Sequence, residues 1–268
     1  MTEPLFLESL EIQQFRAFDH LRIERLGRVN LIVGKNNVGK SSLLEALWLY
    51  AYQGHPVIVW GILERRDEGT RPRSQNLLRG PQGGEDENIE HYSETIERLF
   101  YRNSNGHPKY DAKIGPAGLA DKTLTLALGT EKDNKTNDFV TVIETQFNNQ
   151  PPDIFFVNVS SYRLRNGNRE QCVMVTANGL DIRTAEKFWD NVALTSLEDD
   201  VLGALRIIAP NVERVNLLAG RRGNTGRTPI VKLAGVNDPV PLRSLGEGMN
   251  RMFSIALALV NARGGMLL

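Results

Sequence analysis

The residues with the clearest chemical potential form one glycine-rich segment between an apolar run and a helix-like stretch. They are Gly34, Lys35, Asn36, Asn37, Val38, Gly39, Lys40, Ser41 and Ser42. The segment matches the pattern G-x-x-x-x-G-K-[ST], in which two glycines let backbone amides turn towards phosphate oxygens. Lys40 would reach the β- and γ-phosphates, and the Ser41 hydroxyl would ligate Mg²⁺. The segment therefore predicts a binding site for a nucleoside triphosphate with Mg²⁺.

The identity of the nucleotide base is inferred from a missing sequence match, that to the element with which GTP-binding proteins read guanine. Guanine-binding proteins of this kind read the base with the sequence N-K-x-D. The nearest segment, Asn134–Asn137, has an asparagine in place of the aspartate and falls in a polar turn. We therefore expect adenine, and ATP is the predicted ligand.

A second candidate site opens the apolar helix near the end of the chain. Ser244 and Glu247 have the spacing of a capping box, in which each side chain bonds a backbone amide of the helix start. A serine followed by Gly246 and Gly248 at a helix start also offers amides and a positive dipole end to an anion. The two interpretations are compatible, and both predict that Ser244, Gly246, Glu247 and Gly248 lie at a helix N-terminus.

Hydrophobic patterning predicts the elements that carry these motifs. Strands are expected over 5–13, 21–33, 123–128, 139–146, 154–157, 212–218 and 230–233. Helices are expected over 42–52, 89–101, 184–205 (a pair, with Ser196 capping the second) and 249–262. Within the second strand, Val29–Val33 should be buried ahead of the phosphate loop. This order favours one α/β layered domain, with an insertion at about 55–150.

Composition restricts the class of protein but does not identify a binding partner. The 32 basic and 32 acidic residues cancel, so any surface for nucleic acid must be local. The single cysteine cannot form an internal disulfide, which is typical of a reducing, cytoplasmic compartment. No apolar run is long enough for a membrane span, so no membrane partner is expected.

Three segments together resemble ABC-type ATPases of the branch that includes SMC, RecF and OLD-family proteins. Leu10–Phe18 resembles the opening strand with its N-F-R-x-F ending, and Gly34–Leu47 is close to the family's phosphate loop. Ser244–Gly248 resembles the signature motif, although its order departs from S-G-G-Q/E. The resemblance implies that residues 1–268 form a single ATPase head, with a P-loop core, an antiparallel β subdomain and a helical signature subdomain. It also implies that Arg16 lies near the nucleotide.

The resemblance also locates what the chain does not match. In the family, an apolar strand ending in Asp-Glu, the Walker B strand, follows the signature helix and completes the Mg²⁺ site. Here that place is taken by Gly265–Leu268, so the catalytic carboxylates are unknown. We expect the sequence to be truncated before them and inactive alone. The one acidic cluster of similar composition, Glu198–Asp200, follows Ala193–Leu197, which is predicted to be a helix start and not a strand.

Two functions stay open at this point. In the first, two heads close over ATP, and hydrolysis powers a DNA-repair or antiphage defence function, with DNA and a nuclease partner or fused C-terminal domain as candidate partners. In the second, ATP clamps a homodimer without turnover by this chain. In both, Ser244 of one protomer faces Lys40 of the other. Arg221, Arg222 and Arg227 would either contact DNA phosphates or form a solvated turn.

Overall fold

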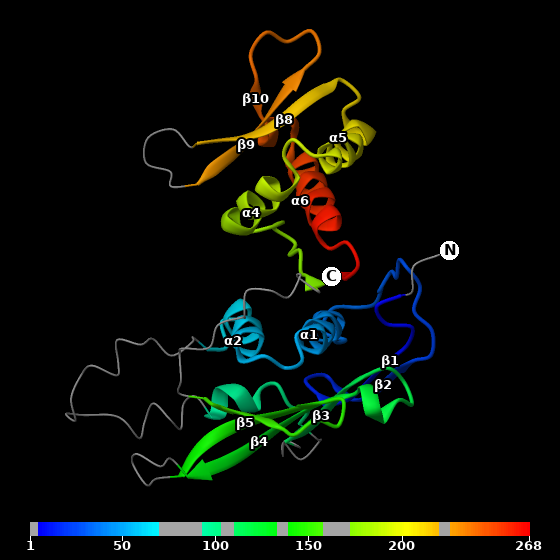
Figure 1. Ribbon diagram of the computed structural model, residues 1–268, viewed down its shortest axis with the longest axis vertical. Coiled ribbons are helices and arrows are strands. Elements are labelled where there is room, and N and C mark those ends of the chain that lie inside the picture. Colours follow the sequence, from blue (N-terminus) through cyan, green and yellow to red (C-terminus); the bar gives the residue numbers. More distant parts are fainter. Residues whose placement is uncertain (1–4, 70–92, 103–109, 133–138, 158–171, 220–225) are drawn as a thin grey trace, which may run out of the picture. The chain divides into compact units, whose positions relative to one another are not determined.

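The protein forms two compact units, Met1–Asn168 and Arg169–Leu268, each of which is described by itself (Figure 1). The computed structural model describes residues 5–69, 93–102, 110–132, 139–157, 172–219 and 226–268. That both units belong to one ATPase head stays a prediction. Over the described parts of the chain, every helix is too short or too polar to cross a bilayer.

The first unit is built on a six-stranded antiparallel sheet in the order β2-β1-β3-β4-β5-β6. The strands are β1 (Leu10–Phe15), β2 (Phe18–Ile23), β3 (Asp111–Gly115), β4 (Leu124–Lys132), β5 (Phe139–Phe147) and β6 (Asp153–Phe156). The segment expected as an insertion supplies β3, β4 and β5, and β3 pairs directly with β1. That segment is therefore integral to the sheet that carries the N-terminal strands.

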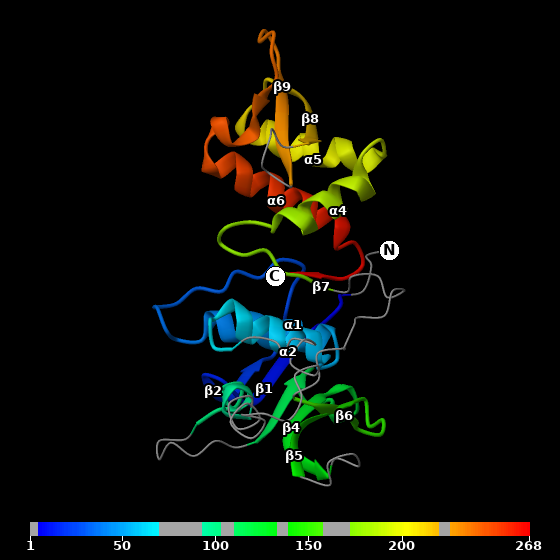
Figure 2. The ribbon, with the colours of Figure 1, turned by 90° about the vertical axis from the view of Figure 1, so that its left-hand side faces the viewer.

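Two helices, α1 (Lys40–Ala51) and α2 (Pro56–Arg65), cover one face of this sheet (Figures 1 and 2). Leu10 and Ile12 alternate with polar residues along β1 and are fully buried. The sequence patterns did not predict α2. Its signal is local, because Pro56 stands at the first helical turn and His55 Nδ1 accepts from the Val57 amide at 3.2 Å.

The predicted strand over 21–33 is wrong beyond Ile23. Residues 24–33 have no strand, and the side chains of Val29, Leu31 and Val33 are 91%, 87% and 78% exposed. A local turn competes with extension here, since the Asn30 side chain bonds both the amide and the carbonyl of Gly27. None of the described strands pairs with this run, so its backbone lacks the neighbour that a buried strand requires.

The second unit combines a three-stranded antiparallel sheet, in the order β10-β9-β8, with three helices. Its elements are β7 (Cys172–Val173), α4 (Ile182–Val192), α5 (Ser196–Ile208), β8 (Val212–Ala219), β9 (Arg227–Leu233), β10 (Val240–Pro241), a 3-10 turn η3 (Leu242–Leu245), α6 (Glu247–Asn261) and β11 (Met266–Leu267). Phe188, Trp189, Phe253 and Leu257 lie at the centre of its core. The short strands β7 and β11 pair in parallel. The predicted strands at 212–218 and 230–233 and the helices of this unit are confirmed.

One capping residue of this unit differs from the prediction. Ser196 is the first residue of α5, and Thr195 is its N-cap, whose hydroxyl accepts from the Leu197 amide at 3.2 Å. Glu198 reaches back to the Leu194 amide at 2.7 Å. Two side chains at the start of α5 thus bond nearby backbone amides, and the cluster that begins at Glu198 lies within the helix, as expected.

Candidate nucleotide-binding site

The phosphate loop is a surface segment that leads directly into α1. Residues 34–38 are exposed, and the backbone turns at Asn37 (φ 62°) and Gly39 (φ 99°). A Cβ added to Gly39 would lie 2.8 Å from the Phe18 ring. Glycine is therefore needed at position 39 for two reasons: the backbone there is left-handed, and the residue packs closely on the β1–β2 turn.

Lys40 closes this loop with its side chain. Its Nζ donates to the carbonyl of Gly34 at 2.9 Å and to the carbonyl of Lys35 at 2.5 Å. The ammonium group of Lys40 thus lies over Gly34 and Lys35, the first two residues of the loop. An incoming phosphate would compete with these two carbonyls for the same cation.

The first turn of α1 has no acceptor of its own. Its N-cap, Gly39, makes no side-chain cap, and the first turn contains no acidic residue. The first intrahelical bond runs from the Leu43 amide to the Gly39 carbonyl at 2.9 Å. The amides of Lys40, Ser41 and Ser42 therefore precede the hydrogen-bonded ladder and face outward with the positive end of the helix dipole.

These residues fit a nucleotide phosphate with Mg²⁺. Ser41 is exposed, so its hydroxyl is accessible to a metal ion, whereas Ser42 is 4% exposed and points into the protein. No group of three or more His, Cys, Asp or Glu side chains that could hold a metal occurs among the described residues. A magnesium ion here would take one ligand from Ser41 and the rest from phosphate and water.

Behind the loop, α1 rests on a buried cluster of charges. Arg16, with a side chain only 6% exposed, contacts Glu45 of α1 at 2.9 Å and Glu68 at 2.8 Å. Arg66, the C-cap of α2, contacts the other oxygen of Glu45 at 2.6 Å and the Ser42 hydroxyl at 3.4 Å. The Arg16 guanidinium is thus held by carboxylates. A direct contact with the nucleotide would require it to leave one of them.

The second candidate segment lies in the second unit. Ser244 is an exposed residue of η3, and α6 begins at Glu247 after the N-cap Gly246. The predicted capping box is wrong, because Gly246 (φ 102°) makes no side-chain cap and redirects the chain between Ser244 and the helix. Glu247 instead pairs with Arg243 at 3.6 Å. Gly246 and Gly248 are open to solvent, with no atom within 4 Å of an added Cβ. That Ser244 faces Lys40 of a partner stays a prediction.

Of the three arginines that are candidates for DNA contact, Arg227 lies within the described residues. Arg227 contacts Asp190 at 2.7 Å and also pairs with Glu186, so it is neutralised within its own unit. Arg221, Arg222 and the segment Asn134–Asn137 lie outside the described residues.

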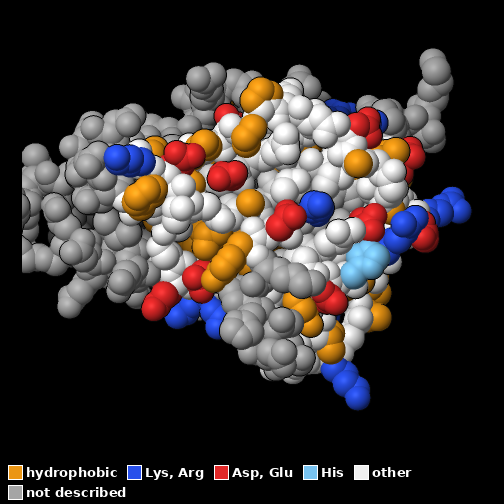
Figure 3. All heavy atoms as spheres, turned by 90° about the horizontal axis from the view of Figure 1, so that it is seen from below, with side chains coloured by type: hydrophobic (Ala, Val, Ile, Leu, Met, Phe, Trp, Pro, Cys, Tyr) orange, Lys and Arg blue, Asp and Glu red, His pale blue; other side chains and the backbone are white. Residues whose placement is uncertain are grey.

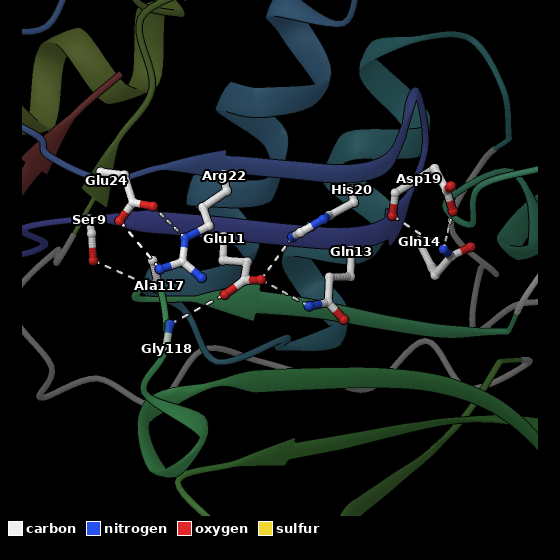
Figure 4. Close-up of polar contacts among 10 residues, drawn as sticks. All are labelled: Ser9, Glu11, Gln13, Gln14, Asp19, His20, Arg22, Glu24, Ala117 and Gly118. Carbon is white, nitrogen blue, oxygen red and sulfur yellow. Dashed lines mark hydrogen bonds and ion pairs between the residues drawn. The ribbon is translucent and has the colours of Figure 1, made fainter.

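A separate hollow of about 430 Å³ lies on the open face of the first sheet, the face opposite α1. Glu11 is one of its lining residues and accepts from His20 at 2.8 Å, Gln13 at 3.1 Å and the Gly118 amide at 3.3 Å (Figure 4). The hydrogen bonds with His20 and then Gln13 lower the pKa of Glu11 below its usual value. This carboxylate ties β1, β2 and the loop after β3 together, so its role is structural.

The same open face carries charges of both signs. In Figure 3, which views the molecule from below in Figure 1, acidic and basic side chains are interspersed with hydrophobic ones. A surface that binds the phosphate backbone of DNA concentrates positive charge. The described side chains on this face show no such concentration of positive charge.

The loop, the lysine and the open helix start have the sequence pattern and the geometry expected of a P-loop nucleotide site, on a mixed α/β fold with an antiparallel sheet. Residues 6–54 match the family described as AAA ATPase domain. Over 46 residues the chain is 39% identical to the DNA replication and repair protein RecF of Clostridioides difficile, covering 17% of this chain and 12% of that protein. Over 51 residues it is 41% identical to an ATP/GTP phosphatase of Helicobacter pylori, covering 19% of this chain and 14% of the relative.

A third relative is an uncharacterized protein of Methanocaldococcus jannaschii, 50% identical over 44 residues, which are 16% of this chain and 20% of that protein. These three matches span at most a fifth of the relatives' lengths. The family match, over residues 6–54, includes the phosphate loop. The chain is therefore similar, over a short segment, to an AAA ATPase domain, to RecF and to an ATP/GTP phosphatase.

Proposed function

We propose that the chain binds ATP with Mg²⁺ at Gly34–Ser42 and supports ATP hydrolysis as part of an ABC-type ATPase head. One observation carries the proposal: the Lys40 ammonium lies over the loop at the open start of α1, where its contacts with described residues are hydrogen bonds to two backbone carbonyls. Phosphate oxygens would bind this cation more strongly than neutral carbonyls do, because the hydrogen bond is then between two charged groups.

Within this proposal the residues divide the work. The amides of the first turn of α1 and Lys40 bind and orient the phosphates, and Ser41 gives Mg²⁺ one protein ligand. Bound Mg²⁺ would neutralise charge that develops on the transferred phosphoryl group. Adenine is the proposed base, from the lack of a match to the guanine-reading element.

The biological role is a wider proposal. Because one group of relatives is named for DNA replication and repair, we propose that ATP turnover drives a DNA-repair or antiphage defence function, with DNA and a nuclease partner or fused domain as partners. Each relative is matched over only a small share of its length, so this role rests on resemblance.

A second candidate function is ATP-gated dimerisation without turnover by this chain. It is favoured by the open start of α6, since Gly246 provides no cap and leaves amides for an external acceptor. In this proposal Ser244 and the Gly246–Gly248 turn of one protomer bind the phosphates held by Lys40 of the other. A two-fold axis would form both composite sites at once.

The first prediction removes the cation of the phosphate loop. We expect Lys40→Ala to reduce ATP–Mg²⁺ affinity at least about a hundredfold, because several charge-assisted bonds are lost together. Calorimetric titration measures the affinity. Lys113→Ala is the matched control, since it removes a lysine from β3 on the same unit, with a side chain 48% exposed. Equal affinity of Lys40→Ala and the parent would contradict the proposed function.

The two candidate functions differ in turnover. Steady-state phosphate release that disappears in Lys40→Ala supports hydrolysis. ATP-dependent dimers with no phosphate release above background support the gated binding module.

A further inference from the structure

The contacts behind the phosphate loop include one that reaches the nucleotide site itself. Arg66 uses two different nitrogens: Nε contacts Glu45 at 2.6 Å, and a terminal nitrogen donates to the Ser42 hydroxyl at 3.4 Å. Ser42 and Glu45 are three residues apart and thus lie on one side of α1. The guanidinium therefore spans the first two turns of that helix from behind.

Ser42 connects this contact to the phosphates. Its amide belongs to the helix start that precedes the first intrahelical bond, from Leu43 to Gly39. Such an amide points towards an anion in the loop. Its side chain points the other way and is 4% exposed, where it meets Arg66. A shift of the Ser42 hydroxyl consequently shifts an amide that would bind phosphate.

The two arginines of the cluster differ in how far carboxylates neutralise their charge. Arg16 is bound to both oxygens of Glu68, at 3.1 and 2.8 Å, and is 6% exposed. Arg66 has a 33% exposed side chain and one carboxylate partner among its described contacts, Glu45, which it shares with Arg16. Of the two cations, Arg66 is the less neutralised and the one in contact with the first turn of α1.

We propose that Arg66 is a positioning residue of the nucleotide site, which acts through Ser42 and Glu45 and strengthens the binding of the phosphates that ADP and ATP share. The inference rests on the proposed function. Lys40 is placed to favour the triphosphate, because its side chain reaches over the loop. Arg66 acts at the base of the loop, from inside the protein, so it does not discriminate between the two nucleotides.

The test compares ADP and ATP affinities, measured by calorimetry with Mg²⁺, in the parent and in Arg66→Gln. We expect both affinities to fall by the same factor of about five to ten, the size of one hydrogen bond's net contribution. Arg65→Gln is the matched control: it removes the neighbouring arginine, which stacks on the Trp48 ring of α1 at 4.5 Å, and should leave both affinities unchanged. Unfolding midpoints separate lost stability from lost binding.

A double-mutant cycle with Ser42→Ala tests the route of the effect. If Arg66 acts through Ser42, Arg66→Gln changes affinity much less in the Ser42→Ala background than in the parent. An undiminished effect there, a loss confined to ATP, or unchanged affinities in Arg66→Gln would each overturn the inference. Arg66→Lys, which keeps the charge but not the two-pronged contact, should bind between the parent and Arg66→Gln, and it carries the test if Arg66→Gln does not fold.

The two proposals fail in different ways. A parent protein that binds neither ADP nor ATP would refute the proposed function, and this inference with it. Loss of binding in Lys40→Ala together with full binding in Arg66→Gln would refute the role of Arg66 alone.

Discussion

The α-helices that the structure describes from start to end begin in two different ways. α2, α4 and α5 start with side-chain caps from His55, Asp181 and Thr195. α1 and α6 start after Gly39 and Gly246, which make no side-chain cap. A capped helix satisfies its first amides internally, whereas an uncapped one leaves them for water or an anion. The two open starts are the two segments that the sequence selected for phosphate binding.

The two open starts are not equivalent. Gly39 has φ 99° and ψ 10°, and it packs against the Phe18 ring. Gly246 has φ 102° and ψ 160°, a region that only glycine adopts readily, but open space surrounds it. α1 has no acidic residue in its first turn, whereas α6 has Glu247 there, partly offset by Arg243. The surroundings of the start of α1 therefore favour an anion more than those of the start of α6.

Among substitutions at the helix starts, the largest effect on stability and nucleotide affinity is expected at Gly39. Gly39→Ala should destabilise α1 by about 1–2 kcal/mol through the left-handed backbone. The contact of the new Cβ with Phe18 should add about 1–3 kcal/mol. Nucleotide affinity should fall as the loop shifts. Amide hydrogen exchange over α1, together with calorimetric titration, measures both consequences.

Gly118→Ala separates backbone strain from this contact. Gly118 also has a positive φ, 75°, but an added Cβ there meets no atom within 4 Å. The control should therefore lose only the backbone contribution and keep nucleotide affinity. If the two alanine variants are equally stable relative to the parent, the packing of Gly39 on Phe18 does not matter.

The next effect concerns the open start of α6. Ser244→Arg should spare ATP binding by the monomer and block ATP-dependent dimerisation, because a bulky cation would occupy the place of the partner's phosphate. Ser244 is exposed, so the fold should tolerate the change. Light scattering with ATP under non-hydrolysing conditions measures the dimer. Asn237→Arg, in the exposed turn before β10, controls for the added charge. Dimerisation of Ser244→Arg at the parent's ATP concentration would rule out the composite site.

These comparisons show which features of the site were predictable from the sequence. The phosphate loop was predictable, because its glycines, Lys40 and Ser41 lie in one short segment and the role of each follows from its own chemistry. The contacts of Arg66 were not, since they join residues more than twenty positions apart and depend on how α2 packs on α1. The capping box at Ser244 failed for a local reason: the spacing was right, but the backbone of Gly246 turns the serine away. Val29–Val33 failed because a strand needs a neighbour, which its own residues cannot specify.

The smallest effect is expected at a capped helix. Asp181 accepts from the Thr184 amide at 3.1 Å and from the Thr184 hydroxyl at 2.6 Å. Asp181→Ala should therefore lower the free energy of unfolding by about 1 kcal/mol, the usual value of an N-cap. Nucleotide affinity should not change, because this cap serves α4 alone. Chemical denaturation at neutral pH measures the loss of stability.

The contribution of Asp181 should also depend on pH in a defined direction. Partial burial raises the pKa of Asp181, but hydrogen bonds from the hydroxyl and amide of Thr184 outweigh it and leave the pKa below its usual value of 3.8. Because the folded pKa lies below the unfolded one, the charged cap stabilises the fold fully above the unfolded pKa, and this stabilisation is lost as the pH falls through the folded pKa. Asp181→Asn keeps a capping side chain that does not titrate. The difference in unfolding free energy between the parent and Asp181→Asn should therefore move against the parent as the pH falls from 7 towards 3. A difference that stays constant over this range would show that the charge of Asp181 adds nothing to the cap.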